Sequence, residues 1–253
     1  MTEIQELKEM LLASQSTIVI TGAGISNSSG IADMEKMNVT TTLETSLEPL
    51  VRMHPEHSYK LLRESFLKAM FEKGPSLSHR KLAELEEEGL VDGIITTNID
   101  HLHSLAGSQN VAEIQGSYAI NRCSKCKVHE DGVDIWNKGK APRCSICNGI
   151  MLSFPVYSHV GVYEPAMKRA NQWILQADLV LVVGSKGNYG SYLNNLSSSA
   201  KIIQINPHPT QFDSIAVLNI REKADNNADC TQKRVENKGH KNLFHPTFNK
   251  VGS

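Results

Sequence analysis

Four runs of mainly aliphatic and β-branched residues recur along the chain, and each run ends in small or polar residues. The runs span residues 16–21, 93–97, 179–184 and 201–206. Continuous apolar runs of this length are typical of strands buried on both faces, as in a parallel sheet. Three of them follow segments with apolar residues at helical spacing, at 3–13, 82–86 and 166–176. This alternation predicts an α/β fold with a doubly wound, Rossmann-like parallel sheet, in which ligands bind at the carboxyl ends of the strands.

The first predicted strand opens into a glycine turn, Gly22-Ala23-Gly24-Ile25-Ser26. Glycines there let the backbone approach a pyrophosphate, and the helix that follows offers N–H groups to its charge. The spacing Gly22-x-Gly24-x5-Gly30 differs from the usual G-x-G-x-x-G fingerprint. We therefore expect a nucleotide to lie differently from the cofactor of a common dehydrogenase. A tight strand–helix turn without a ligand is the alternative.

The four cysteines of two short motifs predict a metal site. Cys123-x2-Cys126 and Cys144-x2-Cys147 are separated by 17 residues, which is a spacing typical of tetrahedral zinc. Since four cysteines leave no position open for water, we expect one structural zinc per chain. It would hold together a module of about residues 119–151, which is too small to fold on its own core. A redox dithiol or a disulfide pair is the alternative.

Composition sets the remaining limits on the class of protein. The chain has 253 residues, 40% of them hydrophobic, and a net charge of −1, which indicates a packed core and no nucleic-acid or membrane-surface partner. No run of about 18 apolar residues exists, and the N-terminal segment is charged, so we expect a cytoplasmic protein with reduced thiols. We expect a main domain at 1–225, with the zinc module inserted, and a poorly ordered polar tail at 226–253. A docked segment around residues 243–246 is the alternative for the tail.

An amide and a carboxylate follow the second predicted strand, in Thr97-Asn98-Ile99-Asp100. At the carboxyl end of a strand these groups would bind ribose hydroxyls or position a water molecule. By themselves they are equally consistent with a polar strand–helix cap.

The order of these motifs resembles the sirtuin family over roughly residues 5–225. The segments that carry the resemblance are Gly22 to Ser26, Pro75 to Leu85, Thr96 to Gly107, Gly116-Ser117, the four cysteines, Ala177 to Ser185 and Ile205-Asn206. The resemblance implies an NAD cofactor bound between the sheet edge and the zinc module, and a lysine-acylated protein as substrate. It implies catalytic roles for Asn98 and Asp100 and cofactor contacts from Gly22, Ala23, Gly24, Ser26, Asp33, Gly184, Ser185 and Asn206.

The chain departs from the family pattern in the cofactor loop and in the substrate clamp. The family's Ile-Pro-Asp-Phe-Arg is here Ile-Ala-Asp-Met-Glu, at residues 31–35. Met34 is apolar and can still shield the reactive ribose, whereas Glu35 reverses a charge. Residues 160–165 resemble a degraded form of the family's substrate clamp.

The largest departure is Gln115, which stands before Gly116-Ser117 where the family has its catalytic histidine. A glutamine amide cannot take up a proton near neutral pH, and losing a general base typically costs about a hundredfold to ten-thousandfold in rate. Deacylation needs that base to activate a ribose hydroxyl. Cleaving the nicotinamide–ribose bond instead needs positioning and charge stabilisation, which Asn98 and Asp100 can still supply.

The sequence therefore predicts an NAD-cleaving sirtuin whose main output is protein ADP-ribosyl transfer, an ADP-ribosyltransferase. Gln115 resembles the sirtuins linked to macrodomain proteins in some microbes, which implies a lipoyl-carrier protein as substrate and a macrodomain partner. The alternatives are a protein-lysine deacylase, or a non-catalytic NAD or ADP-ribose sensor. His101 or His103 is the candidate replacement base, and His79 is expected to be structural.

Overall fold

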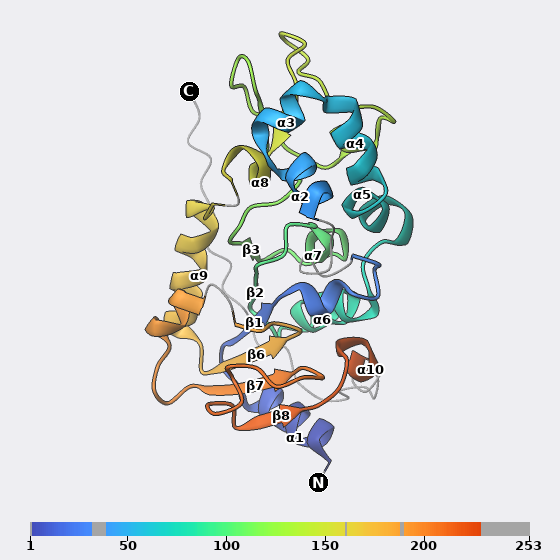
Figure 1. Cartoon of the computed structure of the whole chain (residues 1–253). Coiled ribbons are helices and arrows are strands. Elements are labelled where there is room, and N and C mark those ends of the chain that lie inside the picture. The colour runs from blue at the N-terminus through green and yellow to red at the C-terminus, as the bar shows by residue number, and fades with distance from the viewer. Residues whose placement is uncertain (1, 32–38, 160, 188–189, 229–253) are drawn as a thin grey trace.

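A six-stranded parallel sheet forms the centre of the molecule, in the order β3-β2-β1-β6-β7-β8 (Figure 1). The computed structural model describes residues 2–31, 39–159, 161–187 and 190–228. The strands are β1 (Thr17–Thr21), β2 (Gly93–Thr96), β3 (Val111–Glu113), β6 (Leu179–Val183), β7 (Lys201–Ile205) and β8 (Leu218–Ile220). The chain runs outward from β1 to β3 and then returns to the other side of β1. This places the topological switch point between β1 and β6.

Helices cover both faces of the sheet, as the doubly wound fold requires. On one face, Val19 of β1 packs in a cluster with Leu11 of α1 (Glu3–Ala13) and Leu82 of α6 (Leu77–Glu87). On the other face, Ile18 and Ile20 pack in a cluster with buried residues of α9 (Glu164–Gln176). Because successive strand residues point to opposite faces and both faces are covered, the strands have no polar alternation.

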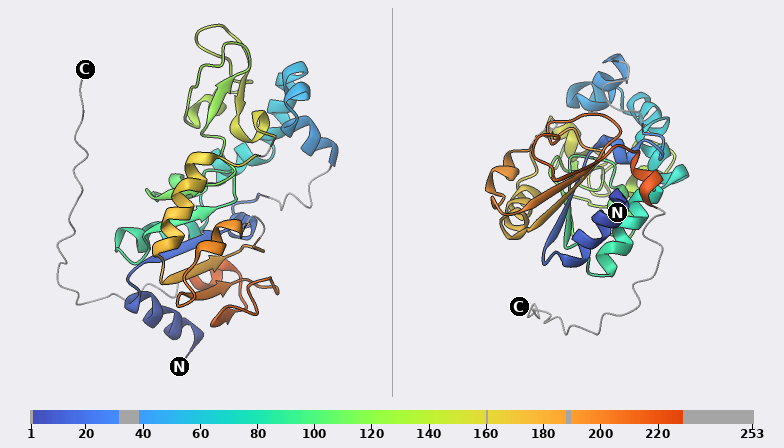
Figure 2. Two further views of the ribbon diagram at one scale, coloured as in Figure 1. Left: turned by 90° about the vertical axis from the view of Figure 1, so that its left-hand side faces the viewer. Right: turned by 90° about the horizontal axis from the view of Figure 1, so that it is seen from below.

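A second structural unit lies beyond the sheet edge and combines the cysteine module with a group of helices (Figure 2). The module contains the antiparallel pair β4 (Asn121–Cys123) and β5 (Met151–Ser153), the 3₁₀ turn η4 (Asp134–Asn137) and helix α8 (Phe154–Tyr157). The helical group consists of α2 (Val39–Ser46), α3 (Glu48–Met53), α4 (Pro55–Arg63), α5 (Phe66–Lys68) and the π-helical turn η3 (Ala69–Lys73).

One hydrophobic core joins the cysteine module to these helices. Tyr59, Leu62 and Phe66 belong to the same buried cluster as Tyr118 and Trp136. The Tyr59 hydroxyl donates to the Trp136 carbonyl at 2.9 Å, and the Trp136 indole donates to the Tyr118 carbonyl at 2.9 Å. The module thus obtains from α4 and α5 the core that its own length cannot provide.

The predicted α/β fold is confirmed, and the four predicted strands correspond to β1, β2, β6 and β7. The three-residue strands β3 and β8 and the helical group were not predicted, because their segments lack an apolar run long enough to be recognised. Helix α10 (Ala224–Ala228) crosses the expected start of the polar tail, and residues 229–253 lie outside the described part of the chain. None of the helices in the described ranges combines the length and apolar character needed to cross a membrane.

Candidate active site

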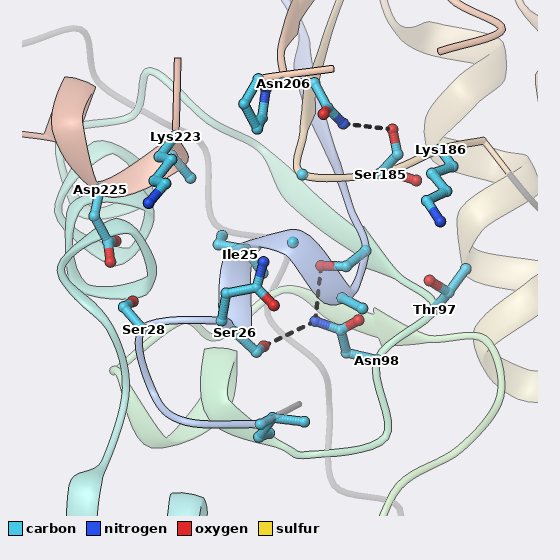
Figure 3. A pocket seen from close by; sticks show the side chains of 18 of the residues that line it. Ile25, Ser26, Ser28, Thr97, Asn98, Ser185, Lys186, Asn206, Lys223 and Asp225 are labelled. Atoms are coloured by element: carbon cyan, nitrogen blue, oxygen red, sulfur yellow. Dashed lines mark hydrogen bonds between the residues drawn. The ribbon is translucent and has the colours of Figure 1, made fainter. Parts of the chain in front are cut away.

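A pocket of about 820 Å³ opens at the carboxyl ends of the strands, above the switch point (Figure 3). Its volume is in the range of small-molecule and cofactor sites, roughly 300–1,000 Å³. Its lining combines the glycine turn after β1, the segment after β2, the ends of β6 and β7, and the turn after β3. The predicted site residues in this lining are Gly22, Ala23, Gly24, Ser26, Asn98, Asp100, Gln115, Gly184, Ser185 and Asn206.

The glycine turn packs directly against the loop that follows β6. It forms η1 (Ala23–Ser26), and the Gly24 N–H donates to the Gly184 carbonyl at 2.9 Å. A Cβ atom added at Gly24 would lie 2.7 Å from that carbonyl oxygen. Gly184 has φ of 60°, and a Cβ added there would lie 2.6 Å from the Ile25 nitrogen. The two glycines are therefore required by contact between the two loops, in addition to any contact with a ligand.

Ser26 connects the glycine turn to the segment after β2. The Asn98 amide donates to the Gly22 carbonyl and to the Ser26 hydroxyl, at 3.1 Å in each case (Figure 3). The Ser26 hydroxyl in turn donates to Asp100 Oδ2 at 2.7 Å. These hydrogen bonds fix the rotamers of all three polar side chains relative to one another, which is the preorganisation that electrostatic catalysis requires.

Asp100 is buried, and its pKa lies above that of an ordinary aspartate. Burial raises its pKa from 3.8 to about 6, although hydrogen bonds from the Leu102 N–H and the Ser26 hydroxyl act to lower it. The Leu102 N–H reaches Oδ1 at 3.0 Å, so both carboxylate oxygens accept a hydrogen bond. The group can therefore hold or release a proton in the pH range where an enzyme works.

Gln115 reaches the same pocket from the turn after β3 and is 8% exposed. Gly116, the next residue, has φ of 62°, and a Cβ there would lie 2.3 Å from the Phe154 ring. The Tyr163 N–H also donates to the Ile114 carbonyl at 2.8 Å. The turn that carries Gln115 is thus held by α8 on one side and by the start of α9 on the other.

Ser185 and Asn206 shape the other end of the pocket. The Asn206 amide donates to the Ser185 carbonyl at 3.2 Å and accepts from the His208 N–H at 3.2 Å (Figure 3). Sequence analysis missed further lining residues here, namely Lys186, His208, Lys223 and Asp225. No motif marks them, and two of them follow β8, a strand too short to be predicted.

The two histidines considered as replacement bases are absent from the pocket lining formed by the described residues. His101 pairs with Glu113 at 2.8 Å; burial acts to lower its pKa, but the hydrogen bond and charge of Glu113 raise it overall. His103 is buried and contacts Thr21. Asp33 and Val160 lie outside the described residues, as do Met34 and Glu35 of the altered cofactor loop.

The four cysteines form one compact group at the edge of the second unit. The sulfur atoms of Cys123, Cys126, Cys144 and Cys147 all lie within 4.8 Å of one another. A zinc ion with Zn–S distances of about 2.3 Å needs sulfurs about 3.8 Å apart, so the group fits tetrahedral zinc.

Both halves of the cysteine site share the same local backbone geometry. The residue after each C-x2-C pair is left-handed, Lys127 with φ of 64° and Asn148 with φ of 56°. Each of these residues donates its N–H to the carbonyl of the first cysteine, at 3.2 Å for Lys127 and 3.0 Å for Asn148. Two matching turns that present four sulfurs to one point agree with a structural zinc site, and no position remains for a catalytic water.

A doubly wound sheet with a preformed polar pocket at its switch point defines a nucleotide-binding class of protein. A model of the Sir2 family matches residues 22–189, and this chain belongs to that family, the sirtuins, which are NAD-dependent enzymes.

Relatives and a solved structure agree over nearly the whole chain. The NAD-dependent protein deacetylase of Thermotoga maritima is 32% identical over 226 residues, which is 85% of this chain and 92% of that protein. The NAD-dependent protein deacetylase of Sulfolobus acidocaldarius is 33% identical over 241 residues, which is 88% of this chain and 91% of that protein. A solved Sir2 complex with a p53 peptide and NAD+ has a TM-score of 0.74 and 30% identity, over 91% of this chain and 97% of that chain.

Proposed function

We propose that this sirtuin binds NAD in the pocket at the switch point, breaks the nicotinamide–ribose bond, and transfers ADP-ribose to a protein acceptor. The observation that carries the proposal is Gln115, a neutral amide that lines the same pocket as Asn98 and Asp100. NAD supplies the ribosyl group and the nicotinamide leaving group. Bond cleavage depends on positioning and charge stabilisation, which a preorganised pocket provides without a histidine base.

The side chains around the glycine turn have separate roles in this proposal. Asn98 and Ser26 orient the cofactor, since their hydrogen bonds fix them relative to Gly22. Asp100 holds a proton at its carboxyl group or releases it, according to pH. Ser185 and Asn206 support the loop that holds the adenosine half, and Gly24 keeps that loop close to the turn.

Protein-lysine deacylation is the second candidate, and two observations favour it. The relatives from Thermotoga maritima and Sulfolobus acidocaldarius are named NAD-dependent protein deacetylases, and the solved relative holds a peptide together with NAD+. In addition, Asp100 has a pKa of about 6 and lies in the same pocket as Gln115, so a carboxylate is present that can accept a proton near neutral pH.

We propose a lipoyl-carrier protein as the acceptor, with a macrodomain protein as partner, and a cytoplasmic location. Four reduced cysteines in metal-site geometry favour a reducing compartment. A non-catalytic NAD sensor is the remaining hypothesis, which nicotinamide release would exclude.

The decisive experiment follows the products from labelled NAD, with an acetyl-lysine peptide and a lipoyl-carrier protein supplied separately. We expect nicotinamide release, labelled carrier protein and little deacetylated peptide. The variant Gln115→His should raise deacetylation by about a hundredfold or more if the base is what is missing.

The matched control is Gln109→His, because Gln109 is an exposed residue outside the pocket lining. Rapid deacetylation by the unmodified protein would contradict the ADP-ribosyl proposal. Loss of that deacetylation in Asp100→Asn, with nicotinamide release retained, would then identify Asp100 as the base of the second candidate.

A further inference from the structure

Two buried histidines that have no part in the proposed chemistry have their rings in contact with each other. His79 comes from the first turn of α6, and His103 comes from α7 (Leu102–Leu105). Their ring centroids are 4.6 Å apart, with 57° between the ring planes. His79 is 0% exposed and His103 is 2% exposed. Burying two imidazoles side by side is costly unless both are neutral and correctly hydrogen-bonded.

Ser76 contacts His79 at the ring nitrogen Nδ1. Nδ1 lies 3.2 Å from the Ser76 nitrogen and 2.8 Å from the Ser76 hydroxyl oxygen, as part of the capping box of α6. A charged imidazole carries an N–H at both ring nitrogens and needs an acceptor at Nε2 as well. That Nε2 atom is buried and has no hydrogen-bond partner among the described residues.

His103 has the complementary arrangement. Its Nε2 lies 2.8 Å from the Thr21 hydroxyl oxygen, while its buried Nδ1 also lacks a partner in the described part of the chain. A charged His103 would carry an N–H at both ring nitrogens, and the one at Nδ1 would be buried without an acceptor.

The surroundings of the pair favour the uncharged forms. Burial lowers the pKa of His79 to about 4, against the opposing charge of Asp225 from α10. Burial, and next the neighbouring His79, lower the pKa of His103 well below 6.5. Asp225 is the carboxylate whose charge acts on His79, and it accepts two hydrogen bonds from Ser78.

Both histidines connect to the glycine turn. Ser76, which is bonded to His79, also donates its hydroxyl to the Ile25 carbonyl at 3.2 Å. Thr21, which contacts His103, directly precedes Gly22. His103 itself lies three residues after Asp100, whose carboxylate accepts from the N–H of Leu102. The pair therefore joins α6 and α7 to the two ends of the turn.

We propose that His79 and His103 are positioning residues that hold the glycine turn against the Asn98–Asp100 segment only while both imidazoles are uncharged. This proposal rests on the proposed NAD site for its functional consequence, which is that acidification loosens the turn and weakens NAD binding. When the turn opens, each imidazole reaches solvent and regains an ordinary affinity for protons. The equilibrium constant for opening then rises about tenfold, for each histidine, with every pH unit below about 6.5.

The test compares the full-length protein with the double variant His79→Asn, His103→Gln. Asparagine keeps an acceptor for the Ser76 N–H, glutamine keeps a group that bonds Thr21, and neither can be protonated. Amide hydrogen exchange is followed by mass spectrometry from pH 7.5 to pH 5, corrected for intrinsic rates. Peptides covering residues 18–30 and 74–80 should lose protection by roughly thirtyfold for each histidine in the natural sequence, and much less in the variant. A peptide from α9 should show no difference between the two proteins.

The same pH dependence in both proteins would overturn the proposal. Should the variant not fold, ¹⁵N NMR of the natural protein decides instead: both imidazoles should be neutral at pH 7, and a charged ring would contradict the proposal. Exchange without ligand tests the pair alone. Repeating the exchange measurement with NAD tests the proposed NAD site. If NAD does not increase protection, the proposed function is contradicted, whereas the proposal for the histidine pair is not.

Discussion

At the scale of single residues, the pocket is built around side chains that fix one another. Asn98, Ser26 and Asp100 form one hydrogen-bonded chain that begins at the Gly22 carbonyl. Gln115 lies in the same lining but is carried by a different strand. A motif shows the types of these residues, whereas the direction of each hydrogen bond is visible only in the fold.

Replacing Asn98 with alanine should lower NAD cleavage. The change removes both donors of the amide and leaves the Gly22 carbonyl and the Ser26 hydroxyl without that partner. We expect nicotinamide release to fall about tenfold or more, because buried polar groups that lose a partner cost free energy. The rate is measured by chromatography of the released nicotinamide. Asn195→Ala, at an exposed position, is the control, and an equal effect in both variants would contradict a specific role.

Asp100 should give the protein a recognisable pH dependence. Its pKa is raised from 3.8 to about 6 by burial, so the folded state holds a proton that the unfolded state releases. The stabilisation is complete below pH 3.8 and is lost as the pH rises through about 6. The melting temperature of Asp100→Asn, relative to the natural protein, should therefore increase from pH 4 to pH 8. Thermal melts across that range check this, and a constant difference would show that Asp100 titrates normally.

At the scale of elements, the close approach of two loops decides what the glycine turn tolerates. From the sequence, a glycine is needed at position 24 so that the backbone can approach a cofactor. The structure adds a second reason, which is close contact with the backbone of Gly184. A side chain at Gly24 consequently disturbs the protein even without a ligand.

Gly24→Ala should both destabilise the protein and weaken NAD binding. Overpacking of this kind typically costs about 1–3 kcal/mol, which should lower the melting temperature by several degrees. The further rise in melting temperature on adding NAD should be reduced or absent. Gly89→Asn is a suitable control, since a Cβ there meets nothing within 4 Å and asparagine tolerates its φ of 70°. Unchanged NAD stabilisation in Gly24→Ala would place the cofactor elsewhere.

At the scale of the whole molecule, the cysteine module and the sheet domain are connected through one core. That core includes Ile99 and Leu102, the neighbours of Asp100, together with Cys123 and Cys144. The metal site is therefore packed into the same core as the segment that holds the Asp100 carboxylate.

Loss of zinc should affect both stability and NAD binding. Cys144→Ala should carry less than one zinc per chain, melt at a lower temperature and show a smaller stabilisation by NAD. Metal analysis and thermal melts with and without NAD measure these effects. Cys230→Ala, which removes the one cysteine outside both motifs, should match the natural protein. Absence of zinc from the natural protein would contradict the metal assignment.

The sequence by itself determined the parallel sheet, the glycine turn and the four-cysteine group, because each depends on a local pattern. Apolar runs mark buried strands, and two C-x2-C pairs mark two matching turns. The residue types of the pocket, from Gly22 to Asn206, follow from their places at strand ends.

Only the tertiary structure decided how these parts cooperate. It places Gly184 against Gly24, gives the cysteine module a core from α4 and α5, and adds Lys223 and Asp225 to the pocket. It also removes His103 from consideration as a base by burying it against His79. These features depend on contacts between segments far apart in the chain, where burial and distance, and not local pattern, determine the energy.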